Sequence, residues 1–245
     1  MKTPLIFAHR GASALAPENT MAAFRLAHEL GAEGIELDVM LSADGKLVVI
    51  HDHAVDRTTN GQGKVRQMTW EQLKTLDAGI KFDARFNGEP LPLLEQVFEE
   101  LGGQILINVE LKNDATPGDQ LTETVIDLIR RTGLQDAIIL SSFVARNLLK
   151  AERREPSVER GLLTRPHLLG APFRGWLGKH YHYNALHPFF KDVTPRLVRR
   201  LHAENKKVNV WTVDKPADLL RMKELGVDSV ICNDPAHARK VLEST

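Results

Sequence analysis

The sequence predicts an α/β protein whose strands close into a (β/α)8 barrel, the TIM-barrel architecture. Apolar segments of strand length alternate with helical segments, which favours parallel βαβ units. Eight such strands can be counted besides one hairpin strand, and a length of 245 residues is common for an undivided barrel. A doubly wound open sheet is the alternative, but no G-x-G-x-x-G segment follows a strand, so the usual dinucleotide fingerprint is missing.

The strands are recognised as short apolar runs, and the helices as amphipathic segments with typical start and stop residues. We expect strands at residues 5–8, 35–39, 47–50, 104–109, 137–140, 161–163, 184–186, 208–211 and 229–231. We expect helices at about residues 17–30, 69–79, 92–101, 119–131, 144–154, 194–204, 216–225 and 235–242. Residues 165–183 are interpreted as a loop with a poor helix.

The chain is expected to be one domain that covers residues 1–245. Before the helix at 92–101, however, residues 54–90 are rich in turn-forming residues and too long for an ordinary connection. We therefore predict a small insertion subdomain at about 54–90, after the second strand of the barrel.

The composition disfavours several classes of protein. Lys plus Arg and Asp plus Glu both number 32, so no net field attracts nucleic acid or an anionic membrane. The single cysteine, Cys232, rules out an intramolecular disulfide and disfavours a thiolate zinc site. The N-terminal apolar stretch is too short for a signal peptide, and no window approaches the roughly 20 apolar residues of a membrane span. We expect a soluble, cytoplasmic protein without a nucleic-acid partner or a stable membrane association.

The predicted site centres on the stretch from residue 33 to residue 53. Glu36 and Asp38 alternate with apolar residues, so in a strand both carboxylates point to one face, about 7 Å apart. A Ser-Ala-Asp-Gly turn then folds the following apolar run back, which brings His51 near the two acids. Two like charges on one buried face are unfavourable unless a cation lies between them. The stretch therefore predicts a metal site with oxygen ligands and a histidine beside it.

Ionisable side chains also follow two other predicted strands, at the carboxyl ends where such barrels carry their active sites. His9 and Arg10 follow the first strand, and with Gly11 they form a loop suited to binding phosphate. Glu110 and Lys112 end the third barrel strand. A third carboxylate at the same mouth favours Mg²⁺ or Ca²⁺ over zinc, because both prefer oxygen ligands.

Some of these features also have purely structural interpretations. One alternative is that the first two acids form a structural ion cluster with Arg10 or Lys112, although buried ion pairs stabilise a fold poorly. Phe143 and Trp211, which end two further strands, either cap the core or form a wall over a ligand. His187 also follows a strand and is expected to be a packing histidine.

A series of short motifs runs through essentially the whole chain. In order, they are His9-Arg10-Gly11, Pro17-Glu18-Asn19-Thr20, Glu36-x-Asp38, His51-Asp52, Asp56-Arg57-Thr58-Thr59-Asn60-Gly61, Leu76-Asp77-Ala78-Gly79, Glu110-x-Lys112, Ser142-Phe143, Trp211-Thr212-Val213 and Asp234-Pro235. Each motif is weak alone, but the ordered set is specific. It resembles the glycerophosphodiester phosphodiesterase family, and most of all its short cytoplasmic bacterial members.

The resemblance implies a barrel enzyme that hydrolyses glycerophosphodiesters such as glycerophosphocholine and glycerophosphoethanolamine to sn-glycerol 3-phosphate and an alcohol. By motif, the family's roles are assigned as follows: acid–base catalysis to His9 and His51, metal binding to Glu36, Asp38 and Glu110, and phosphate contact to Arg10 and Lys112. The expected cofactor is a divalent metal ion, Mg²⁺ or Ca²⁺. Phe143 and Trp211 are candidate substrate-binding walls.

Several alternatives stay open at this level. Either histidine can be the acid, and the nucleophile is water or the glycerol 2-hydroxyl; we favour the hydroxyl, because intramolecular attack has an entropic advantage. Lysophospholipids or another lipid headgroup are alternative substrates, since the aromatic residues of segment 172–183 could line an apolar entrance. A barrel that binds glycerophosphoryl ligands without cleaving them is a different class, and the presence of both histidines with all three acids argues against it. Monomer and homodimer are equally compatible with the sequence.

Overall fold

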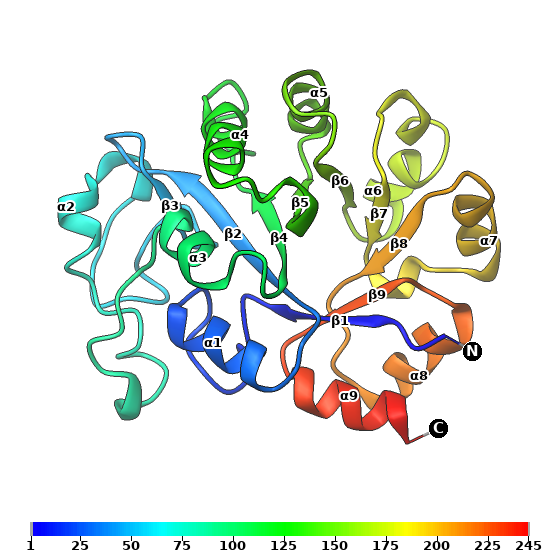
Figure 1. Cartoon of the computed structure of the whole chain (residues 1–245), viewed down its shortest axis with the longest axis horizontal. Coiled ribbons are helices and arrows are strands. Elements are labelled where there is room, and N and C mark those ends of the chain that lie inside the picture. Colours follow the sequence, from blue (N-terminus) through cyan, green and yellow to red (C-terminus); the bar gives the residue numbers. More distant parts are fainter. Residues whose placement is uncertain (1, 245) are drawn as a thin grey trace.

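The computed structural model describes residues 2–244 and has eight parallel strands in a closed barrel with helices around it (Figure 1). Around the barrel, the strands are β1 (Leu5–His9), β2 (Gly34–Leu41), β4 (Leu106–Leu111), β5 (Ile138–Ser142), β6 (Glu159–Thr164), β7 (Ala185–Pro188), β8 (Lys207–Val210) and β9 (Ser229–Cys232). Strand β1 pairs with both β9 and β2, which closes the barrel. The predicted (β/α)8 architecture is therefore confirmed, and the open sheet is wrong.

The helices cover the apolar outer faces of the strands (Figure 1). They are α1 (Met21–Glu29), α3 (Leu94–Leu101), α4 (Leu121–Thr132), α5 (Ala145–Arg154), α6 (His167–Arg174), α7 (Pro195–Ala203), α8 (Pro216–Leu225) and α9 (Pro235–Glu243). On β2, Leu37 and Val39 are fully buried in the same apolar cluster as Phe24 of α1. The acids that alternate with them therefore point into the barrel, because successive side chains of a strand face opposite sides.

Strand β2 continues beyond the barrel into a hairpin with β3 (Leu47–Val49), which is antiparallel to it. Gly45 in the turn has a φ of 76°, a conformation that glycine adopts without strain. Because of this extension, Glu36 and Asp38 lie in the middle of β2.

Residues 54–90 lie between β3 and α3, to one side of the barrel (Figure 1), and form an apolar cluster with the hairpin. The segment contains three short helices, η1 (Val65–Gln67), α2 (Trp70–Leu73) and η2 (Ala84–Phe86). The predicted helix at 69–79 is wrong after its first turn. There the Asp77 carboxylate accepts hydrogen bonds from three backbone N–H groups farther along the chain, an arrangement that competes with helix formation. The prediction of one domain with an insertion stays a prediction.

Two other segments refine the expected boundaries. Helix α1 begins at Met21, later than predicted, because Asn19 adopts a φ of 57° and Thr20 caps the helix through its side chain. The region from 165 to 183 holds α6, which contains Pro172, and the single turn η4 (Gly178–His180), in agreement with the expected poor helix. Within residues 2–244, no helix has the length and apolar character needed to cross a membrane.

Candidate active site

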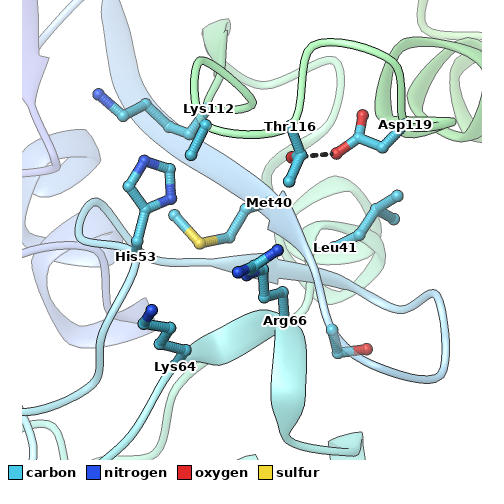
Figure 2. Close-up of a pocket in the computed structure, with 10 residues that line it drawn as sticks. Met40, Leu41, His53, Lys64, Arg66, Lys112, Thr116 and Asp119 are labelled. Atoms are coloured by element: carbon cyan, nitrogen blue, oxygen red, sulfur yellow. Dashed lines mark hydrogen bonds between the residues drawn. The ribbon is translucent and has the colours of Figure 1, made fainter.

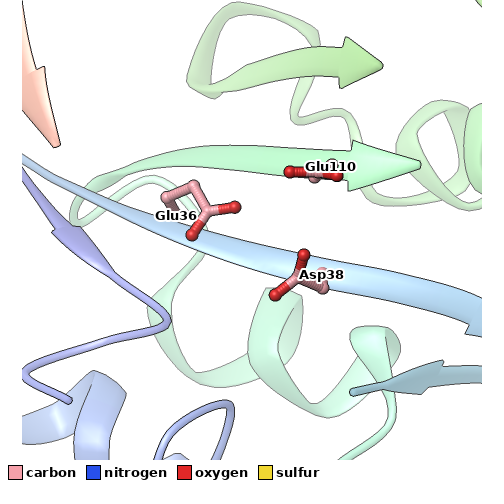
Figure 3. A group of neighbouring side chains, drawn as sticks. All are labelled: Glu36, Asp38 and Glu110. Atoms are coloured by element: carbon pink, nitrogen blue, oxygen red, sulfur yellow. The ribbon is translucent and has the colours of Figure 1, made fainter. Parts of the chain in front are cut away.

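Three carboxylates from two neighbouring strands converge inside the barrel mouth (Figure 3). Glu36 and Asp38 lie on β2, and Glu110 lies on β4, directly opposite Asp38 in the strand pairing. Each residue offers one oxygen atom, and these three atoms all lie within 4.8 Å of one another. Glu36 and Asp38 are only 4% and 1% exposed. We call Glu36, Asp38 and Glu110 the acid cluster.

The acid cluster holds more negative charge than its surroundings balance. Burial, and then the charges of the other two acids, raise the pKa of Glu36 well above its ordinary value. Burial, and then the charge of Asp38, raise the pKa of Glu110 to about 7, although the Lys112 ammonium opposes this shift. Two buried glutamates that resist ionisation next to a third buried carboxylate form a donor set suited to a hard divalent cation.

Arg10 and Lys112 do form ion pairs with the acid cluster, as the alternative of a structural ion cluster requires, but these pairs do not reach all three acids. Arg10 Nε lies 3.4 Å from Asp38 Oδ2, and Lys112 Nζ lies 3.0 Å from Glu110 Oε1. Glu36 forms no ion pair with the described residues and accepts a hydrogen bond from the Arg10 backbone N–H at 3.1 Å. Two cations thus face three buried acids, so internal pairing does not account for the cluster.

A strained turn after β1 directs Arg10 at the acid cluster. Arg10 has a φ of 57°, which residues other than glycine rarely adopt, and Gly11 follows with a φ of 80°. A Cβ atom at Gly11 would lie 2.6 Å from the backbone carbonyl carbon of Ala23, so only glycine fits. The turn therefore holds the Arg10 N–H and guanidinium next to two of the three acids.

A second set of charges holds His51 at the rim of the mouth. His51 Nδ1 lies 2.5 Å from Asp52 Oδ1, and Asp52 also accepts a hydrogen bond from Arg57 at 2.6 Å. Arg57 donates to Glu18 as well, and Glu18 accepts a further hydrogen bond from Arg10. We call Arg10, Glu18, Asp52 and Arg57 the outer ion network. It connects His51 to the arginine beside the acid cluster.

The hydrogen-bond pattern assigns the tautomer of His51. Lys112 Nζ lies 3.4 Å from His51 Nε2. An ammonium group can only donate, so Nε2 accepts and the ring proton lies on Nδ1, from which it is donated to Asp52. Nε2 is therefore the basic atom of the ring.

His9 has the same tautomer through a different partner. Its Nδ1 lies 2.7 Å from Asn233 Oδ1, while Asp214 accepts hydrogen bonds from both the backbone N–H and the Nδ2 of Asn233. This pairing orients the Asn233 amide so that its oxygen accepts the Nδ1 proton of His9. Burial, and then the charge of Arg10, lower the pKa of His9, which favours a neutral ring.

These groups line one cavity of about 130 Å³ at the barrel mouth. Eight of the nine predicted site residues face it: His9, Arg10, Glu36, His51, Glu110, Lys112, Phe143 and Trp211. The ninth, Asp38, belongs to the acid cluster. Phe143 and Trp211 form an edge-to-face pair with ring centroids 5.6 Å apart, so they are a wall of the cavity. His187 is a packing histidine, buried and hydrogen-bonded to Asn209.

Sequence reasoning assigned no role to several polar residues that hold the site in place. Glu18, Asp52 and Arg57 belong to motifs of the resemblance, and the adjacency of His51 and Asp52 was the available signal. Asn233 lies 224 positions from His9, and no local pattern connects the two.

The sequence profile of the glycerophosphoryl diester phosphodiesterase family matches residues 9–237. The chain belongs to this family. A glycerophosphodiester phosphodiesterase from Caldanaerobacter subterraneus is 44% identical to it over 236 residues, which cover 96% of each chain. A second one, from Bacillus altitudinis, is 36% identical and covers 97% of this chain and 98% of its own. The resemblance inferred from the motifs is confirmed.

Solved structures of the family share the barrel. The glycerophosphodiester phosphodiesterase from Agrobacterium tumefaciens superposes with a TM-score of 0.84 at 32% identity, covering 96% of this chain and 99% of its own. A phosphodiesterase from Oleispira antarctica, solved in complex with the product sn-glycerol-3-phosphate, has a TM-score of 0.87 at 28% identity and covers 98% and 97% of the two chains. This family member is an enzyme, a glycerophosphodiester phosphodiesterase.

Proposed function

We propose that the enzyme cleaves glycerophosphodiesters such as glycerophosphocholine and glycerophosphoethanolamine to sn-glycerol 3-phosphate and the free alcohol. The proposal rests on one observation, the acid cluster that shares a cavity with two imidazoles, Arg10 and Lys112. The product in the Oleispira antarctica structure supports the assignment of the phosphate-bearing product. Activity in the cytoplasm is part of the proposal.

A divalent cation, Mg²⁺ or Ca²⁺, held by the acid cluster completes the site that we propose. Glu36, Asp38 and Glu110 supply only oxygen ligands, which both ions prefer. When bound, such a cation acts as a Lewis acid toward a phosphoryl oxygen. Arg10 and Lys112 bind the phosphate and stabilise the negative charge that grows on it in the transition state.

His9 and His51 move the protons. One Nε2 atom removes the proton of the attacking hydroxyl group, and the other imidazole, which carries a second proton on its own Nε2 at this stage, gives that proton to the leaving alkoxide. An imidazole, with an ordinary pKa of about 6.5, suits both tasks near neutral pH. Asn233 and Asp52 keep each ring in the required tautomer by accepting its Nδ1 proton.

We favour the glycerol 2-hydroxyl as the nucleophile. Its oxygen forms a new bond to phosphorus while the bond from phosphorus to the alcohol oxygen breaks, which yields a cyclic phosphate and the free alcohol. Water then opens the cycle with the two imidazoles in exchanged roles. Because internal attack avoids the entropy of bringing in a second molecule, a diester of 2-deoxyglycerol should react at least about 100-fold more slowly. A normal rate with that compound would assign the attack to water.

Lysophospholipids are a second candidate substrate class, favoured by an apolar patch on and after α6. Leu168, Leu169 and Trp176 are 88%, 76% and 68% exposed. The two residues before α6 line a cavity that also contains His51, so α6 begins beside the site. An exposed apolar surface of this kind suits an acyl chain.

A coupled assay for glycerol 3-phosphate tests the proposal. We expect purified enzyme to release it from glycerophosphocholine and glycerophosphoethanolamine, to lose activity with a chelator, and to regain it with Mg²⁺ or Ca²⁺. Release of alcohol from lysophosphatidylcholine at a higher rate would favour the second candidate. Binding of glycerophosphocholine without any product would contradict hydrolysis of that substrate.

A further inference from the structure

A second cavity, of about 480 Å³, shares Lys112 in its lining with the active-site cavity, and Figure 2 shows the residues that line it. It lies between the end of β2, the loop after β4 and the 54–90 segment, and we call it the basic pocket after His53, Lys64, Arg66 and Lys112 in its lining. Lys112 lines both cavities, and its ammonium lies 3.0 Å from Glu110 of the acid cluster. The two cavities are therefore neighbours across one side chain.

Two of these cations have no counter-charge. Lys64 and Arg66 are exposed, and neither side chain forms an ion pair or a hydrogen bond with the part of the chain that the structure describes. Figure 2 shows both side chains extending from the 54–90 segment toward His53 and Met40. Val65 between them is fully buried, and its N–H donates to the His53 carbonyl at 3.0 Å, so their backbone is anchored.

The carboxylates around the pocket already have partners. Asp119, the acid in the lining, accepts hydrogen bonds from Thr116 at 2.7 Å and Asn113 at 2.8 Å (Figure 2 shows the first). Asp114 lies 3.2 Å from His53 and balances that ring when it is protonated. The partners of Asp119 are uncharged, but Lys64 and Arg66 outnumber this single acid of the lining, so the pocket is positive; two neighbouring cations without an ion-pair partner among the described residues favour an anion, most of all a dianion.

We propose that the basic pocket binds an anionic group on the leaving alcohol, such as a second phosphate. The inference rests on the proposed function. A diester phosphate that contacts Lys112 Nζ lies beside the one side chain that lines both cavities, and in our proposal the alcohol extends past this side chain toward Lys64 and Arg66. An arginine guanidinium binds phosphate in a bidentate manner, and a lysine ammonium adds a point charge. Neutral alcohols need neither group.

Two matched substrates test this proposal, the glycerophosphodiesters of ethylene glycol and of ethylene glycol monophosphate, which differ only in the terminal phosphate. We expect wild-type kcat/KM to be about tenfold higher for the phosphate-bearing diester, through a lower KM. A tenfold gain in affinity corresponds to about the free energy of one charge-assisted hydrogen bond between the terminal phosphate and the pocket. Added salt should reduce this preference, since the cations are exposed.

The double variant K64E/R66E should lower kcat/KM for the phosphate-bearing diester at least about tenfold and leave the other diester within about twofold. The matched control is R196E/R199E on α7, which makes the same change in net charge at exposed residues that line neither cavity. It should leave both substrates within about twofold. Thermal unfolding of both variants verifies the fold.

Two results would overturn the proposal: equal kcat/KM for the two diesters in the wild type, or an equal loss of kcat/KM for both diesters in K64E/R66E. Either result leaves the proposed function intact as long as the enzyme cleaves glycerophosphocholine. If no glycerophosphodiester is cleaved, the proposed function itself fails. Inhibition of glycerophosphocholine cleavage by inorganic phosphate in the wild type but not in K64E/R66E, together with equal kcat/KM for the two diesters, would make the pocket a site for free anions and overturn the assignment to the leaving alcohol.

Discussion

The acid cluster and the outer ion network lie at the same barrel mouth, yet their charges are balanced in opposite ways. Burial acts to raise the pKa of Glu18, but hydrogen bonds from Arg57 and Arg10 lower it to about 2. In the acid cluster, burial and repulsion between the acids prevail, and the pKa of Glu110 rises to about 7. The same type of side chain thus behaves differently according to whether a guanidinium donates to it.

This difference separates two tasks within one site. The outer ion network is electrostatically complete, so its effect is to hold His51 and Arg10 in position. The negative charge of the acid cluster is not balanced without a further cation, so a bound metal ion would lower the electrostatic free energy most at this position. The following predictions test this division, from the largest expected effect to the smallest.

Removing one charge from the acid cluster should have the largest effect. We expect Glu36→Gln to lower kcat/KM by more than about 10³-fold and to abolish activation by Mg²⁺ or Ca²⁺, because a Lewis-acid metal contributes several powers of ten. The measurement is the glycerol 3-phosphate assay during metal titration after chelation. Urea unfolding of the metal-free variant serves as the control and should show no loss of stability, since repulsion is relieved. A metal-activated rate near that of the wild type would remove Glu36 from the metal site.

Loss of either imidazole should come next. His9→Ala and His51→Ala are each expected to lower kcat by about 10²–10⁴-fold, the usual contribution of general acid or base catalysis. Steady-state kinetics at saturating metal measures the effect, and circular dichroism checks that the barrel is folded. Near-wild-type turnover in one variant would exclude that histidine from proton transfer.

The link between the outer ion network and His51 should matter less. Asp52→Asn removes the carboxylate that accepts the Nδ1 proton, and we expect kcat to fall about 10–100-fold while metal affinity is retained. Asp83→Asn, in an exposed ion pair with Arg85 of the 54–90 segment, is the matched control and should change neither quantity. An equal effect of both substitutions would mean that Asp52 has no specific role.

The smallest effect concerns the free energy of unfolding, whose dependence on pH has opposite signs in the two regions. In metal-free protein, the folded state holds the Glu110 proton more tightly than the unfolded chain does. The stabilisation that follows, measured as free energy of unfolding, is complete below about pH 4.5 and is lost as the pH rises through about 7. Glu18 does the reverse; its contribution is present above about pH 4.5 and is lost as the pH falls toward about 2. Urea unfolding across this range, with chelator, measures both contributions.

Two charge-removing variants assign these contributions. Glu110→Gln should flatten the decline in unfolding free energy between about pH 4.5 and 7, and Glu18→Gln should flatten the decline on the acid side. If each variant kept the wild-type profile in its own range, the contrast between the two regions would be wrong.

Much of the fold and part of the site follow from local sequence. The direction of a side chain in a strand depends on the backbone of that strand alone, so alternation was enough to place Glu36 and Asp38 on one face. The regular succession of apolar strands and helices was enough to predict the barrel, because few arrangements bury every apolar face. The gathering of ionisable groups at one mouth followed from that prediction, while the catalytic and ligand roles of the individual residues stay predictions.

The rest depends on contacts between segments that are distant in the chain. Only the strand register places Glu110 opposite Asp38, and only barrel closure brings Asn233 to His9. Register, burial and the balance of neighbouring charges are properties of the assembled barrel, so the pKa directions of the acids could not be read from composition. The 54–90 segment shows the same limit, since local patterns neither ended α2 at Leu73 nor placed Lys64 in one cavity with Lys112.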